Sequence, residues 1–70
     1  WRRPVVSGAE ELIGAPGRAL EGFETEGHVR VHGEVWGACT DAPLVSGQHV
    51  RVTGREGLVL QVTPDRDRRD

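Results

Sequence analysis

A stretch of fourteen residues in the middle of the chain reads GHVRVHGEVWGACT, from Gly27 to Thr40. Polar and apolar residues alternate up to Val31, a His32-Gly33 pair follows, and the alternation then resumes. Alternation with a period of two is typical of a half-buried strand, and a two-residue loop that ends in Gly favours a type I′ turn. The stretch therefore predicts two antiparallel strands joined by a tight turn at His32 and Gly33.

The predicted turn also determines which residues of the hairpin face each other. The expected cross-strand pairs are Val31–Glu34, Arg30–Val35, Val29–Trp36 and His28–Gly37. Successive side chains of a strand point to opposite faces. We therefore expect a core face with Val29, Val31, Trp36 and Ala38, and an outer face with His28, Arg30, Val35 and Cys39.

Three further segments, 15–20, 49–53 and 58–63, are predicted to be short strands. Their inward side chains are expected to be Val50, Val52, Leu58, Leu60 and Val62, with Leu44 or Val45 tucked inward from the preceding connection and a tight turn over 54–57. Five short strands bury little as a flat sheet, whereas closing them removes most exposed edges. We therefore predict an all-β fold, a small five-stranded OB-like β-barrel over residues 9–64, with an SH3-like barrel as the alternative.

The two ends of the chain are expected to lie outside this barrel. Residues 1–8 are interpreted as a lead-in, with Ser7 capping a helical turn over 9–13, and residues 65–70 as a disordered charged tail. The sequence has no methionine, so we expect it to be a segment of a longer protein. Trp1, Arg2 and Arg3 would suit the end of a transmembrane region and would place the domain on the cytoplasmic side.

The composition excludes several classes of protein. The chain has 70 residues, a net charge of -2, one cysteine and three aromatic residues. That length fits one small domain. A single cysteine cannot form an internal disulfide or a zinc cage of several cysteines. The net negative charge is also unfavourable for a protein that binds nucleic acid mainly by electrostatics.

Candidate metal and catalytic residues are few. His28 and His32 lie four residues apart on one extended segment, about 13 Å, which one metal ion with bonds near 2 Å does not bridge. Cys39 and His28 could approach each other on neighbouring strands, but we interpret Cys39 as an ordinary small residue. Ser7 and Ser46 are the only serines, and there is no lysine to serve as a base. We therefore expect no catalytic residues, no metal and no cofactor.

Four ordered motifs carry a family resemblance that covers almost the whole chain. They read GxExLIGxxGxA over residues 8–19, EGxVxVxGExWxA over 26–38, GxxVxV over 47–52 and GLxLxVxP over 57–64. Together they resemble the C-terminal soluble domain of NfeD-like membrane proteins. His32 departs from the family pattern, which often has Asn before the turn glycine, and His at that position keeps the turn plausible.

The resemblance implies a function in addition to a fold. It implies an OB-fold barrel after a few transmembrane helices, gene neighbours that encode stomatin/flotillin-type (SPFH) proteins, and in long members an upstream Ser/Lys protease domain. We accordingly expect a non-catalytic protein-interaction module of a membrane protein. It would work with an SPFH partner in membrane organisation or in regulation of a membrane protease, any protease activity lying in an upstream domain.

The outer strand face is the candidate docking surface. It mixes apolar and hydrogen-bonding side chains, as interfaces of transient complexes do. The candidate partner-binding residues are His28, Arg30, Val35, Arg51, Val59 and Gln61. Two alternatives stay open: an ordinary solvated sheet face, and single-strand nucleic-acid binding of the kind OB folds perform. The second lacks exposed aromatic residues for base stacking if Trp36 lies in the core.

Overall fold

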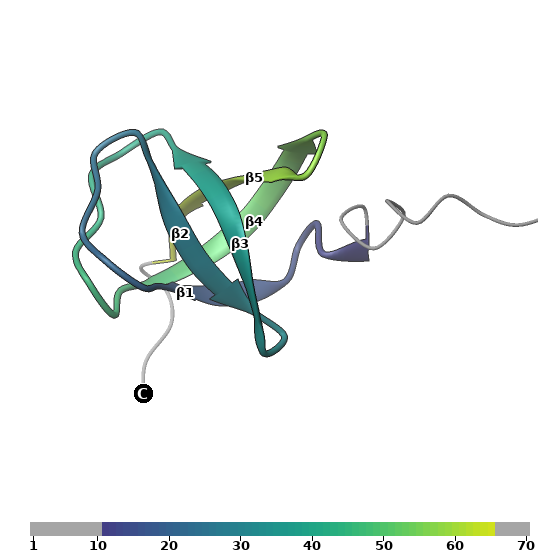
Figure 1. Ribbon diagram of the computed structural model, residues 1–70, viewed down its shortest axis with the longest axis horizontal. Coiled ribbons are helices and arrows are strands. Elements are labelled where there is room, and N and C mark those ends of the chain that lie inside the picture. The colour runs from purple at the N-terminus through teal and green to yellow at the C-terminus, as the bar shows by residue number, and fades with distance from the viewer. Residues whose placement is uncertain (1–10, 66–70) are drawn as a thin grey trace, which may run out of the picture.

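Five strands make up most of residues 11–65, the part of the chain that the computed structural model describes (Figure 1). Their bounds are Pro16–Ala19 (β1), Glu26–Val31 (β2), Glu34–Thr40 (β3), His49–Glu56 (β4) and Val59–Pro64 (β5). They close into a barrel in the order β1-β2-β3-β5-β4, and β4 pairs back onto β1. This strand order, with β5 parallel to β3, confirms the all-β, OB-like barrel rather than the SH3-like alternative.

The β2–β3 hairpin has the predicted register. Val29 faces Trp36, Arg30 faces Val35 and Val31 faces Glu34. The backbone φ is 53° at His32 and 80° at Gly33, which are the two positive values that a type I′ turn requires. The alternation and the turn residues were sufficient here because both signals are local.

The core consists mainly of alternate residues on the inner face of the strands. Every predicted inward valine is buried, and so are Ala38 and Leu60. In the connection before β4 the buried residue is Leu44, whereas Val45 is 66% exposed. Trp36 is half-buried and packs against this core. The buried side chains are Leu12, Ala19, Val29, Val31, Ala38, Leu44, Val50, Val52, Leu60 and Val62.

The predicted turn over 54–57 and the inward position of Leu58 are wrong. Strand β4 continues to Glu56, and the β4–β5 loop is Gly57-Leu58, with Leu58 56% exposed. A register shift between Val52 and Gly54 leaves Thr53 as a bulge, and a bulge lets a strand bend and continue. The φ of 64° at Gly57 suits a turn with Gly in its first position.

The expected lead-in over residues 1–8, its Ser7 cap, and residues 66–70 of the tail lie outside the described residues. Within them, Asp65 follows β5 directly, and its carboxylate lies 3.0 Å from Arg51 Nη2. Near the other end, the side chain of Leu12 is buried in the core.

No helix between residues 11 and 65 is both long and apolar enough to span a bilayer.

Candidate functional site

One row of residues crosses the outer surface of three neighbouring strands, β2, β3 and β5. His28 on β2 faces Gly37 on β3. Ala38 is the parallel partner of Leu60, so Gly37 lies beside Val59 on β5. Strands from three parts of the chain therefore bring His28, Gly37 and Val59 together.

A shallow hollow of about 420 Å³ lies along this row. Gly37 forms its floor, because it has no side chain on the outer face. A Cβ atom at Gly37 would have no atom within 4 Å apart from those of its chain neighbours. The hollow is lined by Glu21, Glu26, Gly27, His28, Gly37, Ala38 and Val59. An inserted side chain could therefore approach the backbone of β3 closely.

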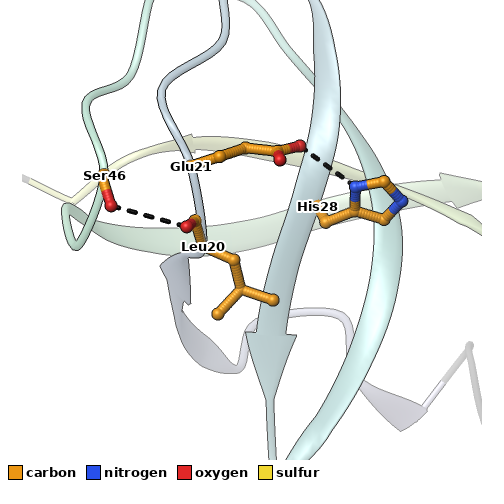
Figure 2. A network of polar contacts seen from close by, with 4 residues as sticks. All are labelled: Leu20, Glu21, His28 and Ser46. Atoms are coloured by element: carbon orange, nitrogen blue, oxygen red, sulfur yellow. Dashed lines mark hydrogen bonds and ion pairs between the residues drawn. The ribbon is translucent and has the colours of Figure 1, made fainter.

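The polar wall of the hollow is a pair formed by His28 and Glu21. Nδ1 of His28 lies 3.0 Å from Oε2 of Glu21, which extends from the segment after β1 (Figure 2). In the same segment, the Leu20 carbonyl accepts a 3.4 Å hydrogen bond from Ser46, which lies in the connection between β3 and β4. Both members of the His28–Glu21 pair are more than half exposed. Because of this exposure, their hydrogen-bonding atoms are accessible to another molecule. Exposed pairs of this kind add little to the stability of the fold.

Exposed apolar side chains continue from the hollow on both sides. Val59 is 42% exposed, and Leu58 in the adjoining turn is 56% exposed. Val35 precedes Gly37 by two residues on the same face of β3 and is 54% exposed. We call His28, Val35, Gly37 and Val59 the docking face. Apolar side chains beside polar groups on a surface that is partly hollowed favour recognition of a protein.

The other three residues that the sequence proposed lie in different positions. Arg30 is exposed on β2 opposite Val35, at the border of the docking face. Gln61 lies farther along β5, where it faces Cys39 and covers Gly54. Arg51 on β4 is separated from the docking face, because its partner on β5 is Thr63, four residues beyond Val59. Its guanidinium donates to the Gly14 carbonyl at 2.9 Å and to Asp65 at 3.0 Å.

No arrangement in residues 11–65 resembles a catalytic or metal site. Cys39 faces Glu26, and no hydrogen bond joins it to His28 within this part of the chain. The described residues contain no cluster of three His, Cys, Asp or Glu side chains that could hold a metal ion. Ser46 Oγ donates to a backbone carbonyl.

The sequence reasoning missed Gly37 and Glu21. The predicted register already placed Gly37 opposite His28, on the outer face. The position of Gly37 in the hollow could therefore have been predicted from the hairpin alone. Glu21 had no such local signal, since its approach to His28 depends on how the segment after β1 passes β2.

Residues 9–64 match the family described as the NfeD-like C-terminal, partner-binding domain. The chain belongs to the NfeD-like family. The matched residues include all five strands, and the family description is that of a partner-binding domain.

Two relatives of this NfeD-like domain come from archaea. It is 37% identical over 67 residues to the membrane-bound protease PH1510 of Pyrococcus horikoshii, covering 93% of the chain and 15% of that protein. It is 33% identical over 62 residues to the uncharacterized protein MJ0826 of Methanocaldococcus jannaschii, covering 86% and 45%. The chain thus spans less than half the length of these relatives.

Two solved structures are similar to the NfeD-like domain. One is the C-terminal domain of stomatin operon partner protein 1510-C from Pyrococcus horikoshii, with a TM-score of 0.79 and 36% identity, covering 87% of this chain and 98% of that one. The other is the soluble domain of a membrane protein implicated in regulation of membrane protease activity from Corynebacterium glutamicum, with a TM-score of 0.72 and 26% identity, covering 77% and 92%. Both are solved chains of about the size of this barrel.

Proposed function

We propose that this NfeD-like domain is the non-catalytic docking module of a longer membrane-anchored protein, and that it binds a stomatin/flotillin-type (SPFH) protein. The partner class is supported by the name of the similar solved domain, a stomatin operon partner. The membrane anchor is supported by the membrane-bound relative. The binding would serve membrane organisation or regulation of a membrane protease.

The observation that carries the proposal is the hollow floored by Gly37. A protein interface needs a central contact from which water is excluded, surrounded by polar groups that keep their hydrogen bonds. Val59 and Val35 supply the apolar surface, and His28 with Glu21 supplies the polar border. We therefore assign the contact to the docking face, with Arg30 at its border.

The experiment is a binding titration of the 70-residue chain with the stomatin-type protein of the same organism. Gly37→Trp would fill the hollow without touching the core, and we expect it to weaken binding at least tenfold. Val45→Trp is the matched control, because it adds the same side chain at a position that is 66% exposed in another part of the surface. Equal binding by wild type and Gly37→Trp would contradict the proposed face.

We infer that any protease activity of the parent protein lies in a domain outside this chain. Hydrolysis through a Ser/Lys pair needs a lysine, and the sequence has none. We also propose that the domain lies on the cytoplasmic side, because Arg2 and Arg3 would follow a membrane span on that side. A topology reporter fused to the C-terminus of the full-length protein tests this placement.

Single-strand nucleic-acid binding is the second candidate, because the barrel has the topology that many nucleic-acid-binding domains use. Base stacking needs exposed aromatic rings. In residues 11–65 the aromatic side chains are Phe23 and Trp36, and both are half-buried against the core. A titration with oligothymidylate at low salt distinguishes the two candidates, since the docking module should show no binding.

A further inference from the structure

Three basic side chains form a line across β2, β1 and β4, on the side of β2 away from the hollow. Arg30 faces Arg18 in the β1–β2 pairing, and Arg18 faces His49 in the β1–β4 pairing. Cross-strand partners point to the same side of a sheet. Like charges directly opposite each other destabilise it, so the pairing of Arg18 with Arg30 is unfavourable without an anion.

Neither arginine has a carboxylate partner among residues 11–65. Arg30 donates to the Gly33 carbonyl at 3.3 Å, and Arg18 Nη2 lies 3.4 Å from His49 Nε2. Both distances exceed the 2.7–3.2 Å usual for a hydrogen bond from a nitrogen donor. By contrast, Arg51 on the same face of β4 has Asp65 at 3.0 Å. Arg18 and Arg30 therefore keep several guanidinium donors available.

The space beside them can receive a small group. A shallow hollow of about 320 Å³ is lined by Pro16, Gly17, Arg18, Arg30, Gly33 and His49. Two guanidinium groups at one hollow match the two oxygens of a carboxylate, which arginine binds in a bidentate manner.

We propose that Arg18 and Arg30 form a carboxylate-binding site that takes an acidic side chain from the protein partner. The proposal rests on the proposed function and adds the chemistry of the partner segment. Arg30 also faces Val35 of the docking face. A segment crossing β2 would place an apolar residue in the Gly37 hollow and an aspartate or glutamate against the two arginines.

The charge of the rest of the domain favours a short acidic segment over a polyanion. The chain carries a net charge of -2, and Glu21, Glu26 and Glu34 are exposed on the same β2–β3 hairpin or beside it. A lipid surface or a nucleic-acid backbone would bring many phosphates close to these carboxylates. One or two carboxylates of a partner protein fit the local basic site without that repulsion.

The test is a titration of the isotope-labelled 70-residue chain with blocked tetraglutamate at low salt, with tetraglutamine as the neutral match. We expect tetraglutamate alone to shift the backbone amide signals of Arg18, Arg30 and Gly33. The double variant R18Q/R30Q should abolish these shifts. The control Arg55→Gln also replaces an arginine by glutamine, but at the end of β4 opposite to His49, and it should keep the shifts. Absence of the shifts, or their survival in R18Q/R30Q, would overturn the proposal.

Further arms separate the sources of the anion. Inorganic phosphate, oligothymidylate and vesicles containing phosphatidylglycerol are titrated in the same way. Shifts at Arg18 and Arg30 that are larger with any of these than with tetraglutamate would also overturn the proposal.

Binding of the stomatin-type protein separates this inference from the proposed function. We expect R18Q/R30Q to weaken that binding about tenfold, and Arg55→Gln to leave it unchanged. Loss of binding in Gly37→Trp but full binding by R18Q/R30Q would refute the carboxylate site while the docking function stands. Shifts with tetraglutamate but no binding of the stomatin-type protein to wild type would refute the proposed partner and leave the carboxylate site supported.

Discussion

The ring of Phe23 fills the space beside Gly27 that a side chain at that position would need. A Cβ atom built at Gly27 would overlap the ring. Phe23 is held there by an isolated bridge to Leu44, with backbone hydrogen bonds of 3.1 and 2.9 Å. At Gly37, on the next strand, an added Cβ atom would meet open space. Packing within the domain therefore requires a glycine at position 27, whereas it does not require one at position 37.

The first prediction compares alanine at these two positions. Gly27→Ala should lower the free energy of unfolding by about 1–3 kcal/mol, because the ring of Phe23 must move. Gly37→Ala should leave it unchanged or raise it by up to about 1 kcal/mol, since alanine restricts the unfolded chain. Urea unfolding of both variants measures the difference. Equal effects at the two positions would contradict the packing described for Phe23.

The second prediction tests the revised position of the last turn. Leu60→Ala should destabilise the domain by about 2–5 kcal/mol, because Leu60 is fully buried in the core. Leu58→Ala should change stability by less than about 0.5 kcal/mol, because the side chain is exposed. Thermal or urea unfolding gives both values. A large loss in Leu58→Ala would favour the inward position that the sequence suggested.

A third prediction concerns the β2–β3 turn. Gly33 has a φ of 80°, so Gly33→Ala should cost about 1–2 kcal/mol of folding free energy. His32→Asn should be neutral or stabilising by a few tenths of a kcal/mol, because Asn-Gly is the preferred type I′ pair. Calorimetric melting temperatures check both changes. A stabilising Gly33→Ala would be incompatible with this turn type.

The fourth prediction concerns the indole of Trp36. Its Nε1 is buried and has no hydrogen-bond acceptor among the described residues. Trp36→Phe loses some apolar contact but removes an unsatisfied donor, whose burial costs about 1–3 kcal/mol. The free energy of unfolding should therefore stay within about 1 kcal/mol of wild type. Trp36→Leu tests the same donor with a non-aromatic side chain, and a loss above about 3 kcal/mol in both would indicate an acceptor for Nε1.

The central hairpin could be predicted because its determinants are local, and the barrel could be predicted from the number of short strands. The alternation around His32 and Gly33 determined the register of β2 with β3, including the pair Val29 and Trp36. The end of β4 could not be read in this way. The polar run 53–56 suggests a turn, whereas pairing with β5 keeps it extended after the bulge at Thr53.

The candidate site was predictable in part for the same reason. His28, Arg30 and Val35 follow from the hairpin register, and Val59 follows from the alternation of β5. Their grouping with Gly37 depends on the parallel β3–β5 pairing, which has no signal in either strand. The alignment of Arg18 with Arg30 likewise depends on how β1 pairs with β2 across the intervening loop. Arg51 was grouped with this face because the order of β4 in the barrel was unknown.

The central claim is that the NfeD-like domain binds its partner through the docking face. The most direct measurement is a titration of the isotope-labelled chain with the stomatin-type protein, followed by the backbone amide signals. We predict saturable shifts or broadening at His28, Val35, Gly37 and Val59. No change at excess partner, or changes that leave these four residues unaffected, would contradict the claim.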